Sequence, residues 1–221
     1  MAEILKIGVP TLVFQLLTSL SIALINRASS NYGDSVIAGM GAVTRITSMG
    51  TLVVFGFLKG FQPIAGFSYG AKKFDRLREA IKTSIIWSTS FCLVVGLVMA
   101  VFSMQIISQF TKGDTQMILV GQKSLFANGI TFILFGFYTV YSSLFLALGK
   151  GAAGFFLGAC RQGVCFVPVI LLLPMVWGMN GILYAQPIAD VISVVITVFM
   201  GLHLHRELSM AEKQVMSNSE M

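Results

Sequence analysis

Residues 83–107 read TSIIWSTSFCLVVGLVMAVFSMQII and contain no charged residue. At a rise of about 1.5 Å per residue, a helix of this length crosses the roughly 30 Å hydrocarbon core of a bilayer. Five further apolar runs have the same character, and strands of a membrane barrel would instead alternate over about 10 residues. We therefore predict an all-α membrane protein, with six transmembrane helices in one bundle at residues 4–26, 36–58, 83–107, 124–148, 157–177 and 182–204. The predicted lobe occupies residues 1–208, and 209–221 form a polar tail.

The composition excludes most soluble classes of protein. Of 221 residues, 56% are hydrophobic and 11% are charged, whereas a soluble domain carries about 25% charged residues. The net charge of +6 comes mainly from loops beside apolar runs, which indicates a lipid bilayer as partner and no nucleic acid. The sequence has no P-loop, no Ser/His/Asp set, no HExxH motif and no metal-ligand spacing. We predict a protein that is not an enzyme and that has no cofactor or metal site.

The placement of Lys and Arg predicts the orientation. Nine of these residues lie in the N-terminus, the second and fourth loops and the C-terminus, and three lie on the other side. Because the cytoplasmic loops of membrane proteins carry an excess of Lys and Arg, both termini are predicted to be cytoplasmic. In residues 72–82, Phe74, Leu77 and Ile81 share a helical face, which predicts an amphipathic helix on the inner leaflet or an ordinary basic loop.

Polar residues form stripes on two of the predicted helices. In the fourth span, Asn128, Thr131, Phe135 and Tyr138 recur at helical spacing, and the first span carries Gln15 and Asn26. Amide, hydroxyl and aromatic groups together suit the wall of a cavity for amphiphilic ligands. The alternative is that these groups bond neighbouring helices within the lobe.

Three formal charges lie well inside predicted spans, at Arg45, Arg161 and Asp190. Counted from the predicted span ends, Arg45 and Asp190 lie at nearly equal depth, and Arg161 lies about 12 Å deeper than Asp190, close enough to the cytoplasm to extend its side chain there. The sequence therefore predicts an Arg45–Asp190 ion pair. Without a partner, Asp190 would be free to bind a proton and to act as an ion-coupling site.

Proline and glycine predict bent and closely packed helices. Pro10 and Pro187 fall within predicted spans and Pro63 falls beside one, and proline in a helix frees a backbone carbonyl. Three pairs of glycines at a spacing of four predict close helix approach, at residues 56 and 60, 66 and 70, and 154 and 158. Bent helices with polar stripes are typical of alternating-access transporters.

One motif resembles a known family. The run GFQPIAGFSYGAKK at residues 60–73, with Gly60, Gln62, Pro63, Gly66 and Gly70, resembles the signature that follows the second helix of each lobe in multidrug and toxic compound extrusion (MATE) transporters. Further similarities extend over residues 1–205, and the motifs resemble the C-terminal lobe. The resemblance implies half of a twelve-helix antiporter in the cell membrane, which exports small cationic or amphiphilic compounds in exchange for Na⁺ or H⁺. In such a transporter, we predict that the polar stripes face a cavity between the two lobes.

The sequence departs from the family in its first span, which contains no acidic residue, although some members carry a buried acid there. The coupling acid of many other members lies in the N-terminal lobe. The resemblance implies a second six-helix lobe as partner, either a separate chain or a second copy of this one. Two alternatives stay open, a truncated lobe without transport activity and a lobe of a lipid-linked sugar flippase.

Overall fold

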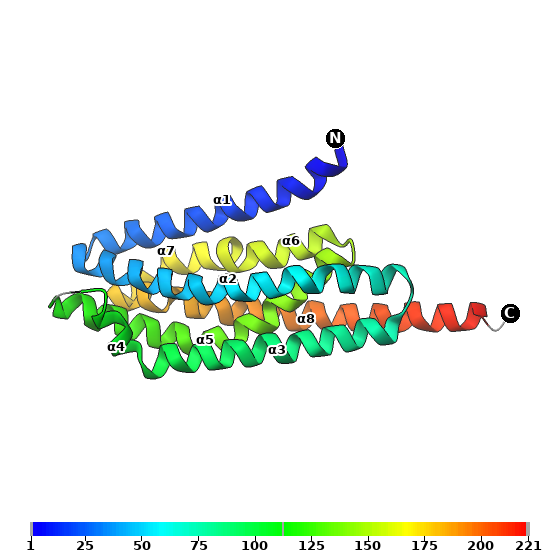
Figure 1. Ribbon diagram of the computed structural model, residues 1–221. Helices are drawn as coiled ribbons and strands as arrows, with labels where there is room; N and C mark the ends of the chain where they lie inside the picture. Colours follow the sequence, from blue (N-terminus) through cyan, green and yellow to red (C-terminus); the bar gives the residue numbers. More distant parts are fainter. Residues whose placement is uncertain (1, 112, 220–221) are drawn as a thin grey trace.

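The computed structural model describes residues 2–111 and 113–219, and within this part every regular element is helical. The chain runs through α1 (Ala2–Ser30), α2 (Asp34–Gly70), α3 (Phe74–Val101), the short α4 (Ser103–Ser108), α5 (Thr115–Ala147), α6 (Gly151–Ala159), a π-helical turn η1 (Cys160–Val164), α7 (Phe166–Trp177) and α8 (Met179–Ser219). The long helices lie side by side in one elongated bundle (Figure 1).

Six helical segments are long and apolar enough to cross a membrane, which confirms the predicted fold class. The fifth of them is composite, because α6, η1 and α7 follow one another over Gly151–Trp177. With an even number of crossings, the start of α1 and the end of α8 lie at the same end of the bundle (Figure 1). Most of the helices extend beyond the predicted spans, and α8 begins three residues earlier than predicted.

The predicted inner-leaflet helix is wrong. Residues 74–82 are the first turns of α3, which begins directly after a tight turn at Lys72, where φ is +54°. Phe74, Leu77 and Ile81 do share one face, but that face is buried in the core of the lobe, at 8%, 0% and 3% exposure. The pattern therefore reported a helix that packs against other helices, and not one that lies on lipid.

Helix α5 lies at the centre of the lobe. It packs against α2, α3 and α8, and 61% of its most apolar stretch is buried, compared with 11% for that of Leu12–Ser30 in α1. Its aromatic residues Phe132, Phe135 and Tyr138 belong to the main hydrophobic core. Because α5 is enclosed on several sides, its polar residues must find hydrogen-bond partners inside the lobe.

A very close helix contact joins α3 to α5 through glycines outside the predicted pairs. A Cβ atom built on Gly96 would lie 2.4 Å from the Gly129 carbonyl oxygen, and one on Gly129 would lie 2.7 Å from the Gly96 carbonyl oxygen. Two turns further along α5, a Cβ on Gly136 would lie 2.7 Å from the Ser88 carbonyl oxygen on α3. We call Ser88, Gly96, Gly129 and Gly136 the glycine seam, in which two backbones touch without intervening side chains.

The predicted glycine pairs are only partly used within the lobe. Cβ atoms on Gly56 and Gly60 would meet no described atom within 4 Å, whereas one on Gly66 would lie 3.2 Å from the Ala147 carbonyl oxygen on α5. A Cβ on Gly154 would press into the Leu146 side chain at 2.7 Å. The spacing of four therefore marks contact surfaces at Gly66 and Gly154 but not at every pair.

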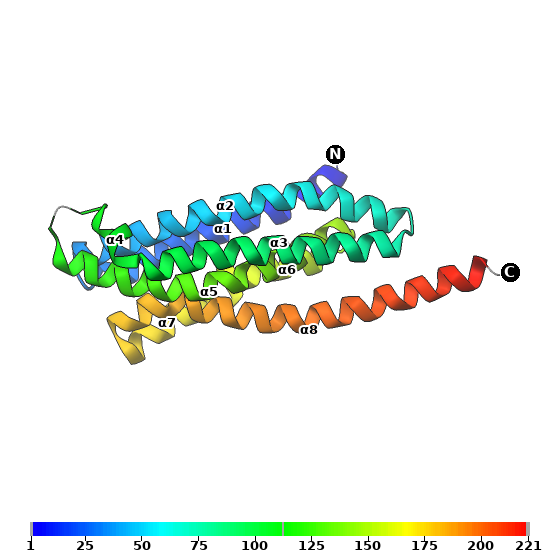
Figure 2. The same ribbon diagram turned by 60° about the horizontal axis from the view of Figure 1, so that its bottom comes forward.

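Proline residues lie inside three of the helices, at Pro63 in α2, Pro174 in α7 and Pro187 in α8. Helix α8 curves along its length (Figure 2). The backbone of Pro10 lies in α1, and its side chain lies outside the part that the structure describes. Each internal proline leaves a carbonyl one turn earlier without its helical donor.

Candidate functional site

A buried ion pair joins the π-turn η1 to α8. The guanidinium of Arg161 binds the carboxylate of Asp190 through two hydrogen bonds, Nε to Oδ1 at 2.8 Å and Nη2 to Oδ2 at 3.3 Å. Both residues are buried, at 7% and 5% exposure. Two parallel bonds between a guanidinium and a carboxylate hold both groups in one orientation, so the pair ties the fifth span to the sixth.

Two further side chains complete the surroundings of this pair. Gln186, one turn before Asp190 on α8, donates from Nε2 to Oδ1 at 2.9 Å. The Arg161 Cζ atom lies 4.6 Å from the centroid of the Phe135 ring on α5, within the range of a cation–π interaction. We call Phe135, Arg161, Gln186 and Asp190 the polar cluster, which gathers residues from α5, η1 and α8.

The predicted pairing of Arg45 with Asp190 is wrong. Arg45 is exposed on α2, whereas α8 packs mainly against α5 and α7. Helix α8 begins at Met179, three residues before the predicted start of the sixth span, so Asp190 lies deeper in the membrane than predicted. At 1.5 Å per residue, the difference in depth between Asp190 and Arg161 falls from about 12 Å to about 7.5 Å. The long Arg161 side chain spans the remaining distance and turns into the lobe.

The π-turn has an identifiable local cause. The Cys165 amide donates to the Cys160 carbonyl at 2.8 Å, a bond to the fifth residue back instead of the fourth. Pro168 has no N–H group and cannot serve the Val164 carbonyl, so the regular bonding pattern is already interrupted next to the turn. From α1, the Ser21 hydroxyl donates to the Gln162 carbonyl and so satisfies an acceptor within the turn. The π-turn was not predicted, although Pro168 is a local signal for it in the sequence.

The polar stripe of α5 lies inside the lobe. Asn128, Thr131, Phe135 and Tyr138 are 2–9% exposed, so the prediction that they face a cavity between lobes is wrong for these four residues. Tyr138 donates its hydroxyl to the Leu157 carbonyl on α6 at 2.7 Å, and Thr131 donates to carbonyls one turn earlier on its own helix. The alternative of bonding within the lobe applies here.

Ser124 provides a second link between α5 and α8. Its hydroxyl donates to the Leu183 carbonyl at 3.5 Å, the acceptor that Pro187 leaves without a helical donor. Asn128 lies against the same serine, because its Nδ2 donates to the Ser124 carbonyl at 2.8 Å and to the Ser124 hydroxyl at 3.4 Å. Pro187 and Asn128 were predicted from the sequence, but Ser124 was not. The carbonyl that Pro187 frees needs a donor from a neighbouring helix, and that need is the signal that could have identified Ser124.

The other predicted site residues lie apart from this cluster. Gln15 and Asn26 are exposed on α1, Gln62 is half-buried on α2, and Pro63 is exposed within α2. Gly70 ends α2, and a Cβ on it would meet nothing within 4 Å. No group of three or more His, Cys, Asp or Glu residues in the described part of the chain is arranged to hold a metal ion.

Comparison with known proteins bears on the whole lobe. The family model named MatE matches residues 10–172. The multidrug export protein MepA of Staphylococcus haemolyticus is 24% identical over 95% of this chain and 46% of its own length, and MepA of a bovine strain of Staphylococcus aureus is 27% identical over 86% and 42%. The chain thus spans about half the length of the curated relatives that it matches.

Solved structures give the same result for the fold. An outward-facing multidrug resistance MATE transporter of the MOP superfamily matches with a TM-score of 0.84 at 20% identity, over 96% of this chain and 47% of that one. The bent form of the Vibrio cholerae MATE transporter VcmN matches with a TM-score of 0.83 at 20% identity, over 94% and 47%. These structures share the fold, and the family model, which matches most of the six-helix lobe, shows that the chain belongs to the MatE family.

Proposed function

We propose that the chain is one six-helix lobe of a multidrug efflux transporter. The observation that carries this proposal is the likeness of 96% of the chain to about half of a multidrug resistance transporter, together with relatives named as multidrug export proteins. The expected substrates are small cationic or amphiphilic compounds, which leave the cell in exchange for Na⁺ or H⁺. A transporter of this kind needs a second lobe, either a separate chain or a second copy of this one.

The exposed polar side chains of α1 support the proposal that this helix contacts the second lobe. Gln15 lies near the middle of α1 and Asn26 lies near its end. Both amide side chains are exposed on the outside of the helix bundle. Amides at membrane depth are costly in lipid and usually face a cavity or a partner helix. We therefore assign Gln15 and Asn26 to the wall of the substrate cavity between the lobes.

The polar cluster supports a structural role for Asp190. Asp190 is the most enclosed carboxylate among the described side chains, and two partners occupy its oxygens. Exchange of a coupling ion there would require the Arg161 contact to break inside the protein, which is expensive. We propose that the site of ion coupling lies in the second lobe, with either Na⁺ or H⁺ as the ion.

Transport is tested in bacteria that lack their own efflux pumps. The chain is expressed alone and together with a six-helix first lobe of a MatE relative, and efflux of the cationic dye ethidium is followed after energisation, with and without Na⁺. We expect efflux above the empty vector in at least one combination and a loss of about fivefold for Gln15→Leu. Leu16→Val, which changes an exposed apolar neighbour, serves as the control. Absence of efflux in every combination contradicts the proposal and favours a lobe without transport activity.

The proposed topology places the protein in the cell membrane with both termini in the cytoplasm. The three native cysteines are buried, so they give little background in thiol labelling. In sealed cells, an impermeant maleimide should label Gln116→Cys at the start of α5 and leave Arg76→Cys at the start of α3 unlabelled. Labelling of the second variant in intact cells reverses the orientation.

A further inference from the structure

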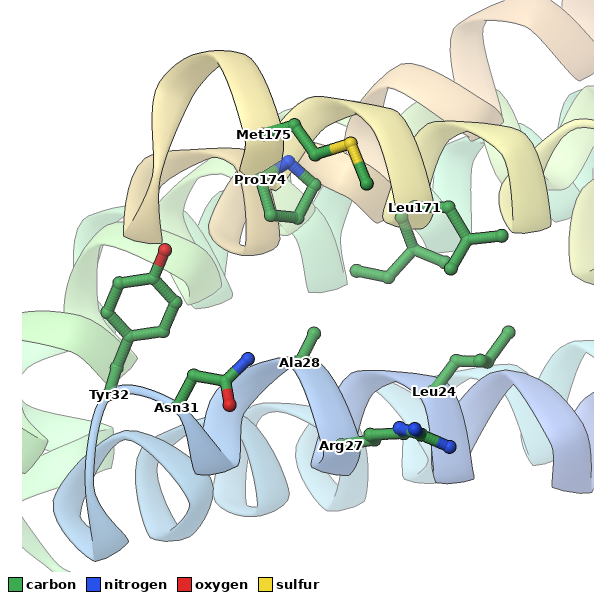
Figure 3. A pocket seen from close by; sticks show the side chains of 9 residues that line it. Leu24, Arg27, Ala28, Asn31, Tyr32, Leu171, Pro174 and Met175 are labelled. Carbon is green, nitrogen blue, oxygen red and sulfur yellow. The ribbon is translucent and has the colours of Figure 1, made fainter.

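A groove of about 310 Å³ separates the end of α1 from the end of α7. In Figure 3, Ala28 on α1 and Asn31, just after the end of α1, point across the gap toward Pro174 and Met175 on α7. Tyr32 stands at one end of the gap, beside the turn between α7 and α8. The groove is far from the termini, at the end of the bundle where the α1–α2 turn lies (Figure 1).

The walls of the groove differ in polarity along its length. Leu24, Ile170, Leu171 and Met175 provide an apolar lining, whereas Arg27, Asn31 and Tyr32 carry the polar groups. Asn31 and Tyr32 follow directly after the last residue of α1, and Leu24 lies six residues before that end, or about 9 Å deeper along the helix. Leu171 likewise lies six residues before the end of α7. Asn31 and Tyr32 are therefore at the level of the membrane interface, whereas Leu24 and Leu171 are at the level of the acyl chains.

Arg27 supplies the positive charge of this rim. Its side chain is exposed and lies along α1 at the mouth of the groove (Figure 3). The ion pairs formed among the described side chains do not include Arg27. In Figure 3 the guanidinium extends along α1 toward Leu24, and Asn31 follows Arg27 by four residues, about one helical turn. An exposed guanidinium without a carboxylate partner, one turn from an amide, is suited to bind a phosphate.

We propose that the groove binds one anionic phospholipid from the surrounding leaflet. Its phosphate accepts hydrogen bonds from Arg27 and Asn31, and one acyl chain lies along Leu24, Leu171 and Met175. A free phosphate would gain nothing from the apolar lining, and a cationic compound would be repelled by Arg27, so the lipid fits both halves of the groove. Val176 and Trp177, exposed next to Met175, extend the apolar surface, and tryptophan is enriched at this depth in membrane proteins.

Native mass spectrometry of the full-length chain in detergent tests this site. The chain is titrated with phosphatidylglycerol, with phosphatidylcholine of the same acyl chains and with glycerol 3-phosphate. We expect one retained phosphatidylglycerol molecule and weaker binding of the other two probes. Arg27→Gln should raise the apparent Kd for phosphatidylglycerol about fivefold, equivalent to about 1 kcal/mol for one basic residue near a membrane surface. Arg27→Lys keeps the charge and should retain most of the affinity.

A steric variant tests the apolar half separately. Ala28→Phe places a ring in the gap while leaving Arg27 intact, and it should remove the bound lipid. Lys123→Gln is the matched control, since it removes one exposed positive charge from α5 at the same end of the bundle, outside the groove, and should shift the Kd by less than twofold. Circular dichroism confirms that each variant is folded.

Three outcomes overturn the proposal. Equal retention of phosphatidylcholine shows that the headgroup charge is not recognised, and equal binding of glycerol 3-phosphate shows that the acyl chain is not. Unchanged binding in folded Arg27→Gln and Ala28→Phe places the lipid somewhere else on the protein. None of these results depends on whether the chain transports ethidium, so the lipid site and the proposed function fail separately.

Discussion

The glycine seam and the polar cluster attach the same central helix to its neighbours by opposite means. At the glycine seam, α3 and α5 touch through backbone atoms, and the contact requires the absence of side chains at Gly96 and Gly129. At the polar cluster, α5 meets η1 and α8 through an aromatic ring, a guanidinium and a carboxylate. The glycine seam depends on the absence of side chains, so it is sensitive to substitutions that add a methyl group. The polar cluster depends on particular charged and aromatic partners, so it is sensitive to substitutions that remove one of them.

The difference has a physical basis in the membrane. Lipid chains are as apolar as leucine, so apolar side chains do not by themselves drive helices together, and either close packing or polar bonding must do so. Helix α3 has no charged residue within its predicted span and packs through glycine. The fifth span is interrupted by a π-turn near Pro168 and carries Arg161, and it is joined to α8 through polar groups.

The largest expected effect comes from separating the buried charges. Arg161→Gln and Asp190→Asn should each lower the free energy of unfolding by about 3–5 kcal/mol, because each leaves an uncompensated charge in the interior. The double variant should recover a large part of that loss. The measurement is unfolding of the purified protein in mixed detergent micelles, followed by circular dichroism.

Arg45 provides the control for this cycle. Because Arg45 is exposed on α2, Arg45→Gln should change the free energy of unfolding by less than 1 kcal/mol and should add independently to Asp190→Asn. Coupling of Arg45 with Asp190, with none between Arg161 and Asp190, would contradict the observed pairing.

A smaller but still clear loss is expected at the glycine seam. Gly96→Ala places a methyl group 2.4 Å from a backbone oxygen that cannot move aside, so α3 and α5 must separate. Overpacking of this kind costs about 1–3 kcal/mol. Thermal unfolding in detergent should show a lower Tm for Gly96→Ala and Gly129→Ala, while Gly56→Ala, which has open space around it, keeps the native Tm. An unchanged Tm for both seam variants would mean that the helices are not in backbone contact.

The Ser124 link should contribute less than either of these contacts. Ser124→Ala removes the donor to the Leu183 carbonyl, and polar bonds between membrane helices contribute about 0.6 kcal/mol on average and at most about 1.7 kcal/mol. Restoring the helical donor with Pro187→Ala should make the serine dispensable, so the loss measured for Ser124→Ala should shrink in that background. Equal losses in both backgrounds would indicate that the serine acts independently of the proline.

The smallest effect is expected at the solvent-facing end of the bundle, where Arg78 on α3 binds Glu212 on the extension of α8 at 2.5 Å. The arginine side chain is 43% exposed, and exposed ion pairs contribute about 0–1 kcal/mol. Arg78→Ala should change the Tm only slightly, and 0.5 M NaCl should abolish the difference from the native protein. A loss as large as that of Arg161→Gln would place the main polar contact of α8 outside the membrane.

The sequence predicted the outline of the fold better than its internal contacts. Six spans and the MATE resemblance are confirmed, since both depend on residues close together in the chain. The candidate site was predicted in part, because Asp190 was selected as a charge inside a span, and Phe135 and Asn128 were selected as members of a stripe at helical spacing. Their partners could not be selected in the same way, since Arg161 was expected to extend toward the cytoplasm and Ser124 was not singled out.

Length, hydropathy and charge placement are local quantities, and they determined that the chain is a membrane protein with an even number of crossings. The tertiary structure alone decided that Asp190 binds Arg161 instead of Arg45, and that Gly96 meets Gly129. Such contacts depend on how far each helix is rotated about its axis and on which helix lies beside it. The π-turn η1 shifts the helical phase of the residues that follow it, and the packing of the whole lobe decides which partners those residues meet.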